Sequence, residues 1–384
     1  MLQPEWALLL ECAKPRPDSS HLSQYLAGPL QWPVLITLAD DHGTLALTAA
    51  RLLDHAEIAI PADSLAQIRA WRRNQALFTL NLTGEMFRLF TNFANAGLEA
   101  LVTKGPVLSQ RCYADPGLRQ YGDLDLIVRD RDVLRFTELM NALGYEGRIP
   151  VAAIQSKKIP GEYVFRHSRS KLLVELHTEL TFRYHPRPLP IERLFARQVH
   201  VAFDGSAIPA LSLEDELVLI CIHGAKHFWE RLIYIADVAA FLARQELNWD
   251  QLFAAAAEVE AQRMLRAGLG LAESLLDAPL PPQISAAVHC DSAVARLTAQ
   301  ITRWLPAAGS APPGIFERAF FRMRMRGNLL SGVPYLFRLS MSPTEDDWVP
   351  GEESRRHWFL DAFGRPFRLV KKYGRDGKTD SSRD

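Results

Sequence analysis

The stretch RQYGDLDLIVRD, residues 119–130, decides the fold that we predict for this chain. It places two aspartates, Asp123 and Asp125, at the start of an apolar run that is typical of a buried strand. Side chains alternate between the two faces of a strand, so both carboxylates should project from one face at one end of a sheet. Two like charges that close repel each other unless a cation lies between them. The pattern therefore predicts a strand that presents a cation site.

The residues around this strand predict an α+β fold, with a small mixed-sheet core between two helical regions. Residues 1–97 have helical spacing, and Asn95-Ala96-Gly97 is a helix ending. Short apolar runs separated by glycine and proline follow, with one helix among them, and they predict a core over 98–205. Helical spacing returns in 206–384, where Ser212 and Asp215 form a capping box, and this region ends in a basic tail.

Composition narrows the class of protein. The chain has 384 residues, 48% of them hydrophobic, which is typical of a globular protein. Its 44 basic residues balance 44 acidic ones, which argues against a nucleic-acid partner and against an anionic membrane surface. The four cysteines are widely separated and no apolar run reaches the roughly 18 residues that span a bilayer. We therefore expect reduced thiols in a cytoplasmic protein without a membrane segment.

Three features of the predicted core fit one chemistry. Lys104 and Gly105 follow the apparent strand 101–103, where a glycine turn lets a phosphate approach the backbone. Asp123 and Asp125 offer the carboxylate oxygens that Mg²⁺ prefers when substrate phosphates complete its coordination. Glu175 lies inside another apolar run, where an unpaired carboxylate is costly to bury. Together they predict a two-metal site for nucleotidyl transfer, with all three carboxylates as metal ligands and as catalytic residues.

Five short motifs carry a resemblance to a known family. They are K-G at 104–105, Y-A-D-P-G-L-R at 113–119, D-L-D at 123–125, L-G-Y at 143–145 and E-L-H at 175–177. In this order they resemble the bacterial uncharacterised nucleotidyltransferase family, and more widely the DNA polymerase β superfamily. The resemblance extends to WPVLITLADDHGTLAL at 32–47 and HGAKHFWERLIYIADVAAFL at 223–242. Two departures from the wider superfamily are K-G in place of G-G or G-S, and the 17 residues 106–122 before the first aspartate.

The resemblance implies a nucleoside triphosphate substrate, with ATP as the default, and Mg²⁺ as the cofactor, for which Mn²⁺ can substitute. Proteins similar to this one occur beside lasso-peptide and exopolysaccharide biosynthesis genes, which suggests a small-molecule or peptide acceptor. Lys104, Gly105 and Arg119 are then the predicted nucleotide-binding residues. Arg119 has an alternative as a surface residue or as an ion-pair partner of Asp115.

A second group of polar residues gives weaker evidence for a role at the site. His177 shares a strand face with Glu175 and is a candidate to orient a carboxylate or contact the acceptor, with a structural histidine as the alternative. His223 and His227 are four residues apart on a helix, but the sequence lacks the glutamate of a zinc H-E-x-x-H motif. We interpret them with Lys226 and Asp237 as a polar patch that faces the nucleotide cleft. The alternative is a hydrogen-bond network between domains.

The sequence thus predicts a Mg²⁺-dependent nucleotidyltransferase that transfers a nucleoside monophosphate to a hydroxyl or phosphate of a small molecule or peptide. One alternative is a toxin-like enzyme of the same fold that modifies transfer RNA or a protein. Another is a module that binds a nucleotide without catalysis. The base, the acceptor and the oligomeric state do not follow from the residues.

Overall fold

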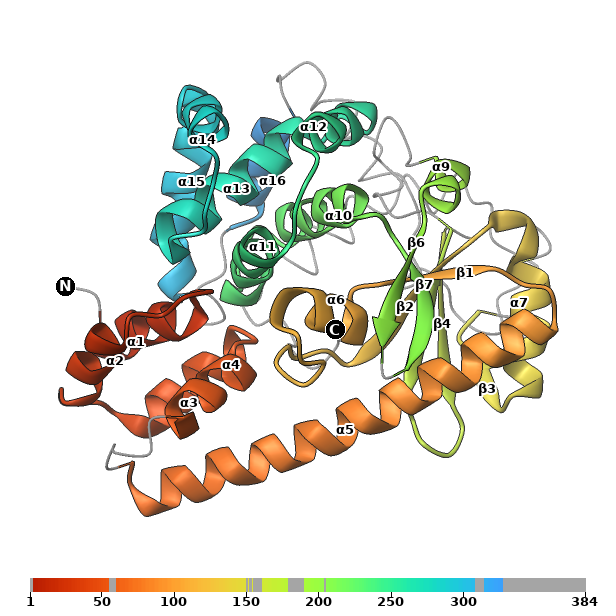
Figure 1. Ribbon diagram of the computed structural model, residues 1–384, viewed down its shortest axis with the longest axis horizontal. Coiled ribbons are helices and arrows are strands. Elements are labelled where there is room, and N and C mark those ends of the chain that lie inside the picture. The colour runs from red at the N-terminus through yellow and green to blue at the C-terminus, as the bar shows by residue number, and fades with distance from the viewer. Residues whose placement is uncertain are drawn as a thin grey trace.

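The computed structural model describes residues 3–54, 60–149, 151, 154, 161–178, 190–203, 205–307 and 314–326. The fold is α+β, as predicted, with a seven-stranded mixed sheet and helical regions before and after it (Figure 1). The predicted basic tail lies outside the described residues. None of the helices described within residues 3–326 combines the length and apolar composition that crossing a bilayer requires. The four cysteines are free thiols, as expected.

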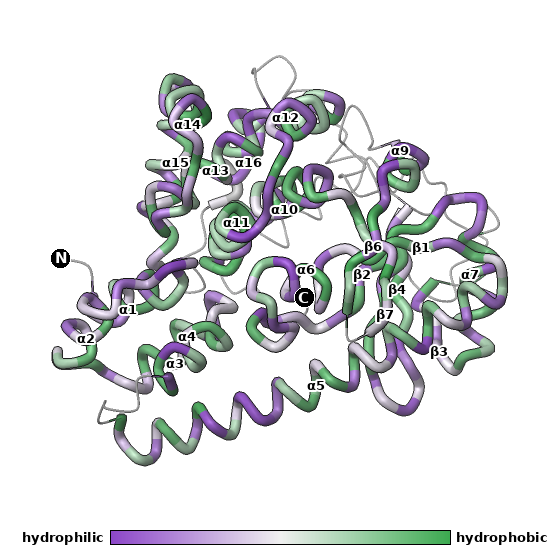
Figure 2. The backbone as a smooth tube through the Cα atoms, in the orientation of Figure 1, coloured by the Kyte–Doolittle hydropathy of each residue, from purple (hydrophilic) through white to green (hydrophobic). Residues whose placement is uncertain are grey.

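The N-terminal region contains helices α1 (Pro4–Ala13), α2 (Ser19–Leu26), α3 (Trp32–Asp41), α4 (Leu45–Asp54) and α5 (Ala62–Asn95). Helix α5 runs beneath the other helices of this region and continues to the sheet (Figure 1). It alternates between hydrophilic and hydrophobic residues along its length (Figure 2). It ends where expected, and Gly97 follows with a φ of +61°, a value that glycine adopts without strain.

The sheet comprises β1 (Ala100–Thr103), β2 (Asp123–Val128), β3 (Tyr145–Gly147), β4 (Glu162–His167), β5 (Leu173–His177), β6 (Val199–Phe203) and β7 (Ser206–Ala210). The strand order is β3-β4-β5-β2-β1-β7-β6. Strand β2 is parallel to β5, and β1 is parallel to β7, whereas the other neighbours are antiparallel. The sheet therefore includes one strand, β7, that begins after the predicted core boundary at 205.

The two faces of β2 pack against different parts of the molecule. Leu124, Leu126 and Val128 belong to an apolar cluster with residues of α5 and of α7 (Val133–Ala142). Ile127 belongs to a second cluster, which is built mainly from the N-terminal and C-terminal helices. Because side chains alternate along a strand, Asp125 shares the face of Ile127. The carboxylate therefore points toward the helices and away from α5.

The remaining helices are α6 (Gly105–Tyr113), α9 (Ile191–Ala196), α10 (Leu213–Lys226), α11 (Leu232–Arg244), α12 (Trp249–Glu258), α13 (Gln262–Leu276), α14 (Pro282–His289), α15 (Ser292–Trp304) and α16 (Ile315–Met325), with short 3₁₀ turns at Asp130–Asp132 and Leu305–Ala307. The predicted cap of α10 is confirmed, because the Asp215 backbone N–H donates to Ser212 Oγ over 3.1 Å. Helix α11 packs against α6 and α13, and α1 packs against α13. The N-terminal and C-terminal helices thus share one apolar core.

Candidate functional site

Two predicted carboxylates lie opposite each other at the centre of the sheet. Strands β2 and β5 pair in parallel with Asp125 aligned with Glu175 and Asp123 aligned with Leu173. Residues that are paired on neighbouring strands place their side chains on the same face. Asp125 is 3% exposed, whereas Glu175 retains 20% exposure of its side chain. The site therefore has a buried carboxylate and a second one that reaches solvent.

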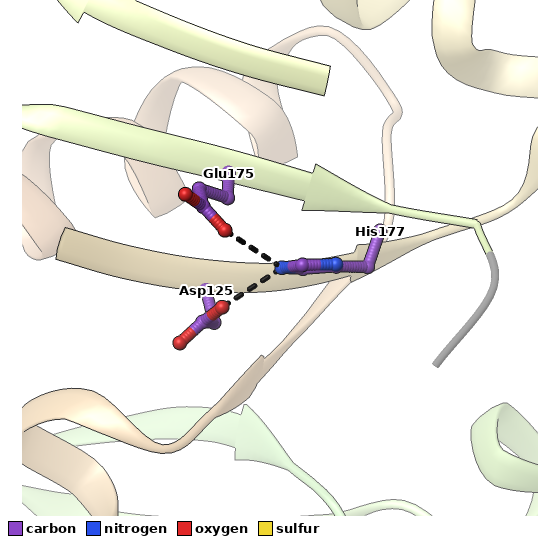
Figure 3. A group of neighbouring side chains, drawn as sticks. All are labelled: Asp125, Glu175 and His177. Atoms are coloured by element: carbon purple, nitrogen blue, oxygen red, sulfur yellow. Dashed lines mark hydrogen bonds and ion pairs between the residues drawn. The ribbon is translucent and has the colours of Figure 1, made fainter. Parts of the chain in front are cut away.

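His177 completes this group. Its Nε2 lies 2.8 Å from Oδ1 of Asp125 and 3.5 Å from Oε2 of Glu175, and it points between the two carboxylates (Figure 3). The ligand atoms of the three residues all lie within 4.8 Å of one another. The carboxylate oxygens suit a hard divalent cation, and an imidazole can join them as a ligand only in its neutral form. Asp123 is on the same strand face, two residues before Asp125, at the start of β2.

Lys104 faces the same carboxylates from the end of β1. Its Nζ lies 3.5 Å from both carboxylate oxygens of Asp125. Its φ of +54° and ψ of −144° are a backbone conformation that residues with a Cβ rarely adopt. Gly105 follows with a φ of +48° and begins α6, so the predicted sharp turn is present. The turn holds a charged amine beside the carboxylates at the beginning of a helix.

The charges of this group influence one another strongly. Burial, together with Asp125 and Glu175, raises the pKa of Asp123 to about 7. Burial alone would raise the pKa of Asp125, but Lys104 and the hydrogen bond from His177 hold it below its usual value. Burial opposes protonation of His177, yet the hydrogen bonds to Asp125 and Glu175 raise its pKa to about 9. At neutral pH, a protonated imidazole and an ammonium group therefore compensate the buried carboxylate.

Arg119 lies in the interior, next to a residue of the C-terminal region. Its Nε donates to Oδ2 of Asp237 over 2.8 Å, and the hydroxyl of Tyr113 donates to Oδ1 of the same carboxylate over 3.0 Å. Arg119 and Asp237 are both buried. Arg119 therefore pairs with Asp237 and not with Asp115. The carboxylate of Asp115 instead accepts a hydrogen bond from the backbone N–H of Gly117. A phosphate contact by Arg119 stays a prediction.

The predicted polar patch of His223, Lys226, His227 and Asp237 does not form one group in the structure, because Asp237 has other partners. His223 and His227 are half-buried neighbours with ring centroids 4.6 Å apart, and Lys226 between them is exposed. Burial lowers the pKa of both histidines well below the ordinary value, and the charge of Lys104 contributes in each case. These two rings are thus within electrostatic reach of the candidate site. Asp237 instead belongs to the Arg119 and Tyr113 network.

The sequence interpretation gave Tyr113 no role of its own, although Tyr113 and Arg119 stand in one motif. Their spacing of six residues allows a helix end and a loop to bring both side chains to one acceptor. The acceptor lies more than a hundred residues later in the chain. No local pattern identifies such a partner.

Comparisons with known proteins agree with this geometry. The family model described as uncharacterised nucleotidyltransferase matches residues 28–277, which is more than half of the 384-residue chain. The match includes the turn at Lys104, the carboxylates of β2 and β5, and helices α10 and α11. No curated protein matches the chain. By this match the chain belongs to the uncharacterised nucleotidyltransferase family, and nucleotidyl transfer from a nucleoside triphosphate is its class of activity.

Proposed function

We propose that the chain is a Mg²⁺-dependent enzyme that transfers a nucleoside monophosphate from a nucleoside triphosphate to a hydroxyl or phosphate of a small-molecule or peptide acceptor. One observation carries the proposal. Asp125 and Glu175 face each other on neighbouring parallel strands, with the amine of Lys104 3.5 Å from Asp125. A cation site beside a fixed positive charge is what a triphosphate requires, because its own charge must be neutralised on both sides.

The donor set fits a hard divalent cation. Asp125 and Glu175 supply carboxylate oxygens, and Asp123 supplies a third carboxylate on the same face, so Mg²⁺ or Mn²⁺ is the expected cofactor. A bound ion of this kind would polarise the reacting phosphate and acidify an acceptor hydroxyl. The order of the glycine turn, the D-x-D strand and the parallel strand with the third carboxylate supports membership of the DNA polymerase β superfamily.

The residues of the chain have separate tasks in the proposed transfer. Lys104 holds the phosphates and offsets their charge, while Gly105 lets the backbone approach them. Glu175 retains exposure, so it is placed to accept the proton of the acceptor hydroxyl. The acceptor oxygen then forms a bond to the α-phosphorus, and the bond to the bridging oxygen breaks. Pyrophosphate leaves with that electron pair.

The test is calorimetric titration with ATP, GTP, CTP and UTP in the presence of Mg²⁺. We expect one triphosphate to bind only with metal, and the double variant Asp123→Ala, Asp125→Ala to lose that binding. Glu146→Gln is the matched control, since it changes an exposed carboxylate on β3 of the same sheet. Binding that is unaffected in the folded double variant, or that needs no metal, would contradict the proposal.

Turnover separates this proposal from a binding module. Release of pyrophosphate in the presence of an acceptor is expected of the wild-type protein and not of the double variant. Asp125→Asn should lower the rate at least about a thousandfold, equivalent to about 4 kcal/mol of transition-state stabilisation. A folded Asp125→Asn variant with wild-type turnover would exclude the assigned role.

A further inference from the structure

Three aromatic rings gather where α10 ends and α11 begins. The rings of His223 and His227 lie 4.6 Å apart, and the ring of Tyr234 lies 5.2 Å from the first and 5.7 Å from the second. Both imidazoles are half-buried, and neither belongs to the carboxylate site on the sheet. The cluster therefore places two imidazole rings at the junction of α10 and α11, and the proposed transfer gives these rings no role.

The backbone that follows these histidines is strained. Phe228 and Trp229 have φ values of +58° and +53°, which are unfavourable for residues with a Cβ. The turn is held by its surroundings. The ring of Trp229 packs directly against Gly224, so closely that a Cβ at that position would come within 2.5 Å of the ring. Just after the turn, the Leu232 backbone N–H donates to Nδ1 of His42 over 3.1 Å. Such strained residues cluster at functional sites, and here they follow directly after the two histidines.

The strongest charged influences on the two histidines are all cationic. Burial comes first in lowering their pKa values, followed by Lys104 for His223 and by Lys226, Lys104, Arg322 and Arg231 for His227. Arg231 already donates to the backbone carbonyl of Asp41, the last residue of α3. Arg322 lies with its guanidinium 4.7 Å from the Phe228 ring centroid. Its Nε has no hydrogen-bond partner among the residues that the structure describes.

A helix C-terminus by itself repels an anion, because its last carbonyls carry partial negative charge. Here three of the last four carbonyls of α10 accept hydrogen bonds. The backbone N–H groups of His227, Phe228 and Trp229 donate to the carbonyls of His223, Ala225 and Gly224, respectively. These hydrogen bonds reduce the repulsion that the end of α10 would exert on an anion.

We propose that His223, Lys226 and His227, with Arg322 from α16, form a second phosphate-binding subsite, which receives a phosphate group carried by the acceptor. Neutral imidazoles can donate and accept hydrogen bonds, and an ammonium and a guanidinium supply charge-assisted ones. Assigning the phosphate to the acceptor rests on the proposed function. The triphosphate is assigned to Lys104 and the carboxylates at the sheet, whereas this cluster lies at the end of α10 and on α16. The acceptor class is therefore a phosphomonoester.

The test uses the full chain with ¹³C-labelled histidine rings, inorganic phosphate as the probe and EDTA to remove metal. We expect the ring signals of His223 and His227, identified with His223→Gln and His227→Gln, to shift and saturate with phosphate. Their pH midpoints should rise, because a bound anion favours the protonated rings. Lys226→Gln and Arg322→Gln should each weaken phosphate binding about tenfold. Lys171→Gln, at an exposed lysine in the β4–β5 turn, is the matched control.

A second arm adds Mg²⁺ and the triphosphate, and repeats the phosphate titration on Asp123→Ala, Asp125→Ala. A phosphate response that survives in this double variant supports the subsite even if nucleotide binding is never found. Signals that respond only to Mg²⁺ with triphosphate, and not in the double variant, would assign the cluster to the nucleotide and overturn the proposal. Signals that respond to neither ligand would overturn it as well.

Discussion

Arg119 donates through Nε to Oδ2 of Asp237 over 2.8 Å, and this buried pair joins the segment before β2 to helix α11. Tyr113 donates to the other oxygen of the same carboxylate. Both donors come from the motif that precedes Asp123. The segment that leads into β2 is therefore tied to α11 through Asp237.

Replacing Asp237 with alanine should destabilise the protein by about 3–5 kcal/mol, because it leaves the buried guanidinium of Arg119 without its counter-charge. The free energy of unfolding in guanidinium chloride measures the effect. Glu246→Ala, at an exposed carboxylate between α11 and α12, should change that free energy by no more than about 0.5 kcal/mol. A loss below about 1 kcal/mol in Asp237→Ala would show that the ion pair has little structural role.

The central strand and its carboxylates were predictable because they follow from local rules. Alternation along β2 placed Asp123 and Asp125 on one face, and the apolar run around Glu175 predicted a neighbouring strand. His177 was a candidate to orient a carboxylate, but which residues Arg119 and His177 contact was not predictable in the same way. Arg119 found a partner on α11, and the approach of His177 to Asp125 depends on the parallel register of β2 and β5.

Strands β6 and β7, the last two strands among the described residues, were also missed. These strands form a hairpin in which half of the residues are exposed, and Pro209 lies within β7. Proline argues against a strand at an interior position of a sheet, which is where β7 lies. Their place beside β1 is set by tertiary pairing.

Gly224→Ala should destabilise the protein by about 1–3 kcal/mol, although alanine is the better helix former. A Cβ at this position would meet the ring of Trp229 at 2.5 Å, and Trp229 is completely buried. The matched substitution is Gly84→Ala on α5, where nothing lies within 4 Å of the added carbon. That variant should gain about 0.5–1 kcal/mol. Thermal unfolding of both variants decides the matter, and equal effects would refute a specific clash.

Lys104 offers a test of strain at the candidate site. Its backbone conformation suits glycine, so Lys104→Gly should be more stable than Lys104→Ala by about 1–3 kcal/mol. Both variants remove the amine beside Asp125 and should weaken binding of the metal–triphosphate complex to a similar extent. Chemical unfolding and calorimetry measure the two effects separately. If Lys104→Ala binds the triphosphate as tightly as the wild type, the lysine is not a phosphate ligand.

His42 should make the stability of the protein depend on pH. The side chain is fully buried in the connection between α3 and α4, and burial lowers its pKa to about 4 from an ordinary value of 6.5. Above pH 6.5 the imidazole is neutral in both the folded and the unfolded chain. As the pH falls from 6.5 to 4, the unfolded chain takes up the proton first, so His42 favours unfolding progressively.

Over that interval the contribution of His42 amounts to about 3 kcal/mol, since each unit of pKa shift corresponds to about 1.4 kcal/mol. In the wild type, Nδ1 of His42 accepts a hydrogen bond from the Leu232 backbone N–H. His42→Asn removes the titrating ring but keeps an acceptor atom near that position. We expect this variant to take up about one proton fewer on unfolding between pH 4 and 6.5. The slope of the unfolding free energy against pH measures this number, whereas any packing loss shifts the whole curve. A slope unchanged from the wild type would mean that His42 titrates normally in the folded protein.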